Sequence, residues 1–539
     1  MIFGSLNYDL IAIDKEQFST KFGALMVGQD FLMSLLMYGK FDEYHFFTYS
    51  KKEGGTIKEG LLSTTKNADK LLFKDISELQ DSLKKNDYSL FHIMDTELHR
   101  LSYLRRKTSK LFPITATTHS LTELDQMFTG FLNMTGNIYP FDSIICTSKC
   151  GMEFLKKQFA LLSERFLKEY NSKIKYNGRL DLIPLGVNLD LFKISEKNEA
   201  REKLNIAKDK IILFSMARFS ISYKMDLIPL IRCFKDLLEE YKNLLLILAG
   251  DDTDYDYSTL LNDFIDKIGI KENVILMVNI NEATKQLLYS AADIFVSPSD
   301  NIQETFGIAP IEAMAAGLPI VVSDWDGYKE TVIHEKTGFR VPTYWENCDN
   351  NISPLAPLFT NRYYHFCLAQ SVFIDVNKMK EYLKLLVEDE SLRKKIGKNG
   401  IEHAKNNYDW KVIIPKYERL WAELKEISKN YKLEERQNLF EPSFYQLFNH
   451  YPTNSNFIKD SLKFKPTSLG EKINLDIFFE NYIYDSIEQL IPRDNLKLIL
   501  SLLKEGKNIN EILQILNIGK KELNYMMMWL LKHGLITYG

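Results

Sequence analysis

The stretch that decides the fold runs from Ala291 to Val341 and reads AADIFVSPSDNIQETFGIAPIEAMAAGLPIVVSDWDGYKETVIHEKTGFRV. Its pattern predicts a strand (IFVSPS), a loop (DNIQETFG), a helix (IAPIEAMAAG) and a second strand (PIVVSD), then a polar connection ending in a turn at Thr337-Gly338. Strand, helix and strand in this order form the βαβ unit of a parallel sheet, whose ligands collect at the carboxyl ends of the strands. The expected fold class is therefore α/β.

Three residues give that sheet edge its expected chemistry. Gly307 lets the backbone come close to a ligand, and N–H groups at a helix start attract phosphate. Glu304 precedes the helix and Glu312 lies on it, so both could face one ligand. A carboxylate accepts hydrogen bonds from two hydroxyls, which suits a sugar ring or a ribose. The alternative is that Glu304 is a solvated loop residue and Glu312 a solvated helix residue.

The whole string resembles the donor-site signature of retaining GT-B glycosyltransferases of family 4, E-x-F-G-hydrophobic-x-x-x-E-A-M-A-x-G-x-P. This sequence keeps every element of it. The resemblance implies two doubly wound, Rossmann-like domains and a nucleotide-sugar donor such as a UDP- or GDP-sugar, with no cofactor and no metal. It also implies that Glu304 contacts hydroxyls of the donor sugar and Glu312 the ribose. The implied donor-binding segment further includes Thr305, Phe306, Gly307 and Ile308.

A basic pair stands upstream in IILFSMARFSISYKMDLIPLIRCF, where a buried strand leads into a loop and a helix. Arg218 and Lys224 in that loop could bracket a diphosphate, the first as a fork and the second as a point charge. Taken alone, both would be surface charges. The pair resembles the family's G-R-x-x-x-x-K-G phrase, although Ala217 and Met225 replace its glycines. The resemblance therefore assigns catalytic roles to Arg218, Lys224 and Glu304.

The next strand, LLLILAGDD, ends at Gly250, which matches the family's hydrophobic-x-G phrase and joins the expected donor site. Asp252-Thr253-Asp254 formally makes a D-x-D metal motif. That motif belongs to a single-domain glycosyltransferase fold, whereas two α/β halves are visible here. We therefore expect no metal site.

Residues 1–195 are expected to form a first, acceptor-side Rossmann-like domain. In the resembled family a glycine loop after the first strand faces the donor phosphates, and Gly23 is the candidate, although Ala24 interrupts the usual glycine pair. The strand PITATTHS ends at His119, where the family often has a histidine at the reaction centre. The alternative for Gly23 is a helix that merely packs with small residues. The alternative for His119 is a histidine that bonds its own loop. His92, inside the preceding strand, is expected to be structural.

The second, donor-binding domain is expected at 196–407, with an irregular insertion at 343–371 that would form an acceptor wall or a lid. Residues 408–430 are expected to return to the first domain as a closing helix. The remaining residues, 432–539, form a helical appendage. From about 490 onward, three short amphipathic helices and a strand resemble a winged-helix module.

That module is not expected to bind nucleic acid, because residues 481–539 hold seven Lys/Arg and six Asp/Glu, a net charge of +1. Its last helix contains Tyr-Met-Met-Met-Trp-Leu, which favours a core or a protein contact. We expect capture of a peptide or protein acceptor, with oligomerisation as the rival hypothesis.

Composition limits where the protein works. The net charge of −4 argues against a general nucleic-acid role, and five scattered cysteines are typical of free thiols in a reducing compartment. Neither a signal peptide nor an apolar run of 18 residues is evident, so a cytoplasmic location is expected. Basic and apolar residues in LHRLSYLRRKTSKLF and FLKKQFALLSERFLKEY predict either peripheral contact with the inner membrane face or solvated amphipathic helices.

The function expected from the sequence is transfer of a sugar, with retention of configuration, from a nucleotide-diphosphate sugar to an unidentified peptide, saccharide or lipid acceptor. Two alternatives stay open. A degenerate copy would act as a binding or scaffold subunit, and a protein of the same fold could be a phosphorylase or a disaccharide synthase.

Overall fold

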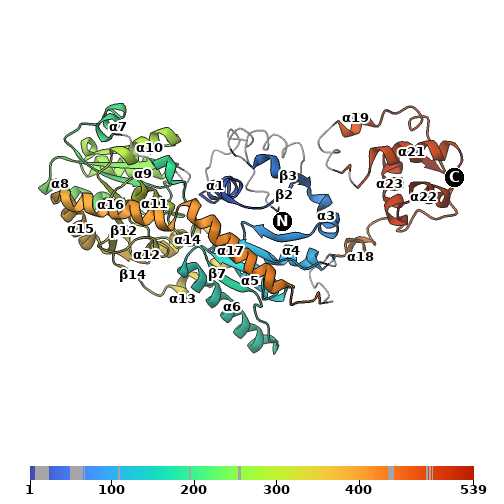
Figure 1. Ribbon diagram of the computed structural model, residues 1–539, viewed down its shortest axis with the longest axis horizontal. Coiled ribbons are helices and arrows are strands. Elements are labelled where there is room, and N and C mark those ends of the chain that lie inside the picture. Colours follow the sequence, from blue (N-terminus) through green and yellow to red (C-terminus); the bar gives the residue numbers. More distant parts are fainter. Residues whose placement is uncertain are drawn as a thin grey trace. The chain divides into compact units, whose positions relative to one another are not determined.

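The structure is a computed structural model of the 539-residue chain. It describes residues 1–6, 23–48, 65, 67–106, 108, 110–192, 196–252, 256–434, 442–480, 484, 487–488 and 490–539, with the backbone alone for 23–27. By its contacts the chain divides into two compact units (Figure 1). The first comprises Met1–Phe46, Thr56–Leu72 and Asn86–Glu435, and the second Phe47–Gly55, Phe73–Lys85 and Arg436–Gly539.

A seven-stranded sheet is built from the first part of the chain, in the order β3-β2-β1-β4-β5-β6-β7. The pairings from β1 through β4, β5 and β6 to β7 are all parallel. Its strands are β1 (Ile2–Leu6), β2 (Glu43–Thr48), β3 (Leu71–Asp75), β4 (Tyr88–Ile93), β5 (Ile114–Thr117), β6 (Ser143–Cys146) and β7 (Arg179–Leu182). The α-helices between them are α1 (Gly23–Tyr38), α3 (Leu79–Lys85), α4 (Leu98–Arg105), α5 (Gln126–Thr135) and α6 (Lys149–Tyr170).

A six-stranded parallel sheet follows, in the order β10-β9-β8-β11-β12-β13. Its strands are β8 (Ile211–Met216), β9 (Leu244–Gly250), β10 (Val274–Val278), β11 (Ile294–Ser297), β12 (Ile320–Ser323) and β13 (Gly338–Val341). Its α-helices are α7 (Lys197–Lys203), α8 (Ile228–Glu240), α9 (Tyr257–Lys267), α10 (Glu282–Ala291), α11 (Ile308–Ala315), α12 (Tyr328–Thr331), α15 (Val376–Glu388) and α16 (Glu390–Asn407). The sequence predicted only a turn at Thr337-Gly338, whereas in the structure β13 begins at Gly338 and pairs with β12.

Both faces of the second sheet are covered, which explains why its strands are continuous apolar runs. In β8, Leu213 packs into one hydrophobic core while Phe214, the next residue, packs into the other. Alternate side chains of a strand point to opposite faces, so a strand covered on both sides must be apolar at every position. The strand order reverses between β8 and β11, and ligands of such sheets bind outside the carboxyl ends at this point.

The helix α17 (Trp410–Ser428) returns to the first sheet (Figure 1). Trp421 donates its Nε1–H to Thr115 Oγ1 of β5 at 3.1 Å, and Tyr417 Oη lies 3.1 Å from Thr117 Oγ1. Both aromatic side chains are buried, so α17 covers the first sheet with a large apolar surface.

The sequence predicted an irregular insertion at 343–371, but the structure forms regular elements there. It holds β14 (Thr343–Trp345), α13 (Asp349–Ile352), a 3-10 turn (Ala356–Leu358) and α14 (Asn361–Ala369). The chain then forms β15 (Val372–Ile374), which pairs antiparallel with β14 and closes the insertion at its base.

The residues after 441 form a separate hydrophobic core. They contain α18 (Phe444–Phe448), β16 (Phe464–Pro466), α19 (Asp476–Phe479), α21 (Arg493–Lys504), α22 (Ile509–Leu516), α23 (Lys520–Lys532) and β17 (Ile536–Tyr538). The expected three helices and final strand are present. However, β17 pairs with β16, which precedes the helices, and not with a neighbour after α23. The winged-helix assignment therefore stays a prediction.

Candidate functional site

The loops after β8 and β11 meet at the point where the strand order of the second sheet reverses. Lys224 Nζ, from the first loop, forms an ion pair with Glu304 Oε2, from the second. The Glu304 side chain is 7% exposed and that of Lys224 is 18% exposed, so the pair is largely shielded from water. A second donor, Tyr328 Oη, reaches the same carboxylate oxygen at 3.1 Å. The structure thus brings together two residues that lie 80 positions apart in the sequence.

Gly307 is needed for this arrangement. Its φ is +90°, and a Cβ built on it would lie 2.2 Å from Cε1 of Tyr328. A side chain at this position would therefore displace the Tyr328 ring, which also bonds Ser297 Oγ at 2.8 Å. Because Tyr328 donates to Glu304, the glycine supports the carboxylate indirectly as well as opening the backbone. Sequence analysis missed Tyr328, since nothing local to it signals this role.

Asp326 is a second residue that sequence analysis missed. Its φ is +39°, an uncommon backbone conformation for a residue with a side chain, and its Oδ1 is buried with no hydrogen-bond partner among the described residues. Burial, followed by the charges of the nearby Glu304 and Glu330 carboxylates, raises the pKa of Asp326 to about 8. Its carboxyl is therefore mainly neutral at pH 7 and can donate a hydrogen bond.

Arg218 lies close enough to Glu304 for their charges to interact. Burial lowers the pKa of its guanidinium, and the charge of Glu304 opposes that shift. Gly250 has a packing role at the neighbouring strand end, because a Cβ there would lie 1.6 Å from the carbonyl oxygen of Ala217. Of the D-x-D stretch, only Asp252 is described, and its Oδ2 accepts from Ser258 N at 3.1 Å; residues 253–255 lie outside the described residues.

Glu312, on α11, forms its own ion pair. Its Oε1 lies 2.7 Å from Lys285 Nζ, and its Oε2 accepts from Tyr289 Oη at 2.8 Å. A carboxylate has about four lone-pair sites, so these two partners leave it able to accept from a further hydroxyl. Asp30 of α1 interacts electrostatically with the Glu312 carboxylate. Burial, followed by the charge of Glu312, raises the pKa of Asp30 to about 6. Lys285, Tyr289 and Asp30 carry no sequence signal, because each reaches Glu312 only through the fold.

His119 directly follows Thr118 at the end of β5, on the first sheet. Its backbone oxygen accepts a hydrogen bond from Thr305 Oγ1 at 3.0 Å, which joins it to the loop of Glu304. Its Nε2 is buried and has no hydrogen-bond partner in the described part of the chain. Burial lowers the pKa of His119 to about 4, so the ring is neutral near pH 7. By contrast, both ring nitrogens of His92 contact threonine hydroxyls within the sheet, at 2.9 and 3.3 Å.

The other residues of the predicted donor segment follow Glu304 in the chain. Phe306 is buried in the core, Ile308 is the first residue of α11, and Thr305 bonds the first domain. Gly23 is the first residue of α1, and residues 7–22 before it lie outside the described residues.

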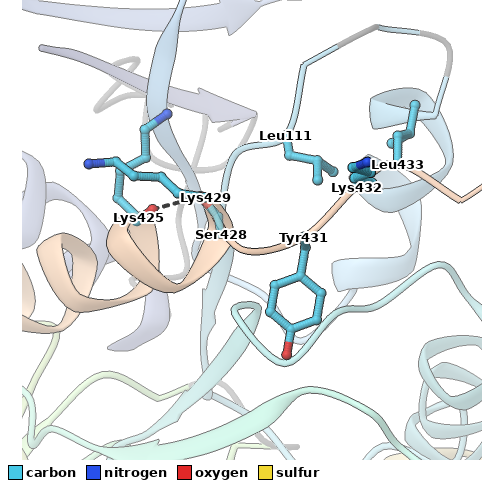
Figure 2. Close-up of a pocket in the computed structure, with 7 residues that line it drawn as sticks. All are labelled: Leu111, Lys425, Ser428, Lys429, Tyr431, Lys432 and Leu433. Carbon is cyan, nitrogen blue, oxygen red and sulfur yellow. Dashed lines mark hydrogen bonds between the residues drawn. The ribbon is translucent and has the colours of Figure 1, made fainter.

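A pocket of about 370 Å³ lies elsewhere, at the carboxyl end of α17. It is lined by Leu111, Lys425, Ser428, Lys429, Tyr431, Lys432 and Leu433. Figure 2 shows the side chains of Lys425 and Lys429 extending away from the Tyr431 ring. Lys425 Nζ bonds the carbonyl oxygen of Tyr88 at 2.9 Å, and Lys429 pairs with Glu426 at 2.6 Å. Both ammonium groups therefore already have partners, and the pocket shares no residue with the predicted site.

The described residues contain no group of three or more His, Cys, Asp or Glu side chains placed to hold a metal ion. Among the same residues, no helix is both long and apolar enough to cross a membrane.

Residues 196–355 match the family model of Glycosyl transferases group 1. An uncharacterized glycosyltransferase of Methanocaldococcus jannaschii is 33% identical over 178 residues, which are 33% of this chain and 42% of the relative. The alpha-monoglucosyldiacylglycerol synthase of Streptococcus pneumoniae is 29% identical over 206 residues, covering 37% of this chain and 41% of the relative. The chain thus spans less than half the length of these curated relatives.

Solved structures resemble a larger part of the chain. Sucrose-phosphate synthase of Thermosynechococcus elongatus is 18% identical with a TM-score of 0.53, covering 79% of this chain and 100% of its own. Anabaena HepE in complex with UDP and glucose is 16% identical with a TM-score of 0.52, covering 78% of this chain and 100% of its own. These likenesses confirm the predicted fold, an α/β protein with two Rossmann-like domains of the GT-B type.

Proposed function

We propose that the chain is a retaining glycosyltransferase that moves a sugar from a nucleotide-diphosphate sugar to an acceptor. The supporting observation is the Lys224–Glu304 ion pair beside Arg218, at the sheet edge where β8 and β11 end. That edge holds two cations for a diphosphate and a carboxylate for sugar hydroxyls, at the place where such sheets bind ligands. The family match of residues 196–355 supports the same class of reaction.

In the proposed reaction, Arg218 and Lys224 neutralise the negative charge that develops on the departing diphosphate. Preorganised charges of this kind are usually the largest single contribution to catalysis at such sites. Glu304, held by Lys224 and Tyr328, accepts hydrogen bonds from the donor sugar. The neutral ring of His119 bonds a sugar hydroxyl through the Nε2 that has no partner among the described residues.

Retention follows in this proposal from attack and departure on the same face of the sugar. The acceptor hydroxyl bonds the anomeric carbon as the bond to the diphosphate breaks, and the hydroxyl proton passes to the departing phosphate oxygen. No metal is required, because the two cations supply the charge. Transfer should therefore persist in EDTA at an unchanged rate, and restoration by added Mg²⁺ of a rate lost in EDTA would contradict this part.

The decisive experiment measures binding of UDP and GDP by calorimetry and then donor turnover by mass spectrometry across a panel of nucleotide sugars. Lys224→Ala should weaken nucleotide binding about tenfold, the effect of losing one charged hydrogen bond. Lys242→Ala is the matched control, since Lys242 is exposed and lies on the same domain. Tight nucleotide binding without turnover would favour a scaffold subunit. Activity only with phosphate or a free sugar phosphate would favour a phosphorylase or disaccharide synthase.

We propose that the second unit captures a peptide or protein acceptor. Tyr525 and Met528 are 51% and 46% exposed on α23, in the helix that the sequence analysis singled out. Tyr525→Ala with Met528→Ala should raise the KM for a peptide acceptor and leave donor hydrolysis unchanged. A change in oligomeric state without a change in KM would favour the rival hypothesis of oligomerisation.

Peripheral membrane contact is a separate proposal, supported by the exposed face of α6. Phe154 and Leu161 are exposed there, and so are Lys157 and Arg165. Apolar and cationic side chains on one helix surface suit an anionic bilayer. Sedimentation with vesicles of phosphatidylglycerol but not of phosphatidylcholine is expected, and no sedimentation with either would leave α6 as a solvated helix.

A further inference from the structure

The segment that follows β5 is held by side chains from the second domain. Gln303 Nε2 donates to Ser120 Oγ at 2.9 Å, and Thr122 Oγ1 donates to Gln303 Oε1. With the bond from Thr305 to the carbonyl oxygen of His119, this makes three hydrogen bonds over four residues of the segment. His119 is therefore presented by a segment whose position depends on partners far away in the sequence.

The insertion supplies further partners of this segment. Tyr364 Oη, on α14, donates to the carbonyl oxygen of Thr122. His365 Nε2 lies 3.2 Å from the same oxygen and 3.0 Å from Tyr364 Oη. Tyr364 is 4% exposed and His365 is fully buried, so water cannot replace either contact. A buried carbonyl that loses its donors costs more than the bond itself contributes.

The ring of His365 is fixed in one tautomer by its surroundings. Its Nδ1 is buried and has no partner among the described residues, while Nε2 faces a carbonyl oxygen, so the proton lies on Nε2. Burial lowers the pKa of His365 and keeps the ring neutral. Its other neighbour is Tyr223, whose ring stands edge-on with centroids 5.3 Å apart. Tyr223 directly precedes Lys224, so α14 contacts the segment that carries His119 and the segment that carries Lys224.

We propose that α14 of the insertion positions the segment that presents His119, with Tyr364 and His365 as positioning residues. The contacts at Thr122 set the segment against the loop of Glu304, and the contact with Tyr223 ties it to the loop of Lys224. The importance of this device for catalysis rests on the proposed function, whereas the positioning itself does not.

The test uses diethylpyrocarbonate, which ethoxycarbonylates a neutral imidazole nitrogen and releases ethanol and carbon dioxide. The rate is followed for the peptide that contains His119 by mass spectrometry of the full-length protein. Tyr364→Phe removes one of the two donors to the carbonyl oxygen of Thr122 and should speed modification of His119 about fivefold, the effect of one hydrogen bond on a local opening. Tyr363→Phe is the matched control, because the neighbouring Tyr363 is 52% exposed.

Modification of His99 provides an internal reference, since its Nδ1 lies 3.3 Å from Asn133 Oδ1, a contact that does not involve the insertion. Equal rates at His119 in the two variants would overturn the proposal. Equal acceleration of His119 and His99 would also overturn it, because Tyr364 would then support the fold as a whole. His365→Gln, which keeps an N–H donor, should stay slow, whereas His365→Leu should be fast. No sugar substrate is needed, so failure of the proposed function would leave this result intact.

Discussion

The two sheet edges that meet at the candidate site are built in different ways. The edge of the second sheet draws much of its chemistry from one short stretch, in which Glu304, Gly307 and Tyr328 support one another. The edge of the first sheet offers His119, which is held by Thr305 and by a segment that contacts Gln303 and Tyr364 of the other domain. We call the edge of the second sheet, with Glu304, Gly307 and Tyr328, the dense edge. We call the edge of the first sheet, with His119 and the contacts that hold it, the dispersed edge. The difference shows which edge of the candidate site can be predicted from the sequence.

The largest expected effect tests the dense edge. Lys224→Met leaves the buried carboxylate of Glu304 without its ion-pair partner and should lower the free energy of unfolding by about 3 kcal/mol. The double variant Lys224→Met/Glu304→Gln should recover much of that loss, because neither member of the ion pair then carries a charge. Urea denaturation of the parent, the single variant and the double variant measures these unfolding free energies. Gln303→Leu, on the dispersed set, should cost only about 1 kcal/mol, a neutral hydrogen-bond loss. Equal costs for Lys224→Met and Gln303→Leu would remove the contrast between the edges.

The second effect separates the two functions of Gly307. Gly307→Ala must adopt a positive φ and also place a Cβ against Tyr328, whereas Gly269→Ala meets only the first demand, since no atom lies within 4 Å of its Cβ at φ +74°. The control should cost about 1 kcal/mol of unfolding free energy and Gly307→Ala about 2 kcal/mol more. Nucleotide affinity, measured by calorimetry, should fall only in Gly307→Ala. If both variants lose the same unfolding free energy, the Tyr328 ring does not depend on the space that Gly307 leaves for it.

Sequence analysis found the dense edge because its physical causes are local. Gly307 and the start of α11 follow from turn and helix chemistry, and the meeting of Lys224 with Glu304 follows from parallel strands that end at one edge. It could not find Lys285 or Tyr364, because each is an ordinary surface-type residue until the chain brings it to Glu312 or Thr122. The helices of the insertion were missed for a related reason: its aromatic, Asn- and Pro-rich composition lacks a clear period.

The third effect concerns Asp326, which belongs to the dense edge yet was not predicted. Its pKa is raised to about 8 in the folded protein, so the folded state holds a proton that the unfolded state releases near pH 4. Stability from this group is therefore complete below about pH 4 and declines as the pH rises towards 8. Asp326→Asn is neutral throughout, so between pH 5 and 7 it should lose less unfolding free energy than the parent, by about 1.4 kcal/mol for each pH unit. Parallel stability profiles of the two proteins between pH 5 and 8 would contradict the buried neutral carboxyl.

The smallest effect tests His119 at the dispersed edge, where the sign is reversed. Burial lowers the pKa of His119 to about 4, below the value of about 6.5 expected in the unfolded chain. Stability from this group is complete above pH 6.5 and is lost as the pH falls, because the unfolded state then binds the extra proton. Between pH 7 and 5.5, His119→Gln should lose about 1 kcal/mol less unfolding free energy than the parent. Urea denaturation at the two pH values measures this difference. His92 would contribute equally to both proteins and so cancels, which isolates the ring whose Nε2 faces the proposed donor sugar. An identical loss in both proteins would mean that the His119 ring is already solvated, and its proposed contact with the sugar would lose its physical basis.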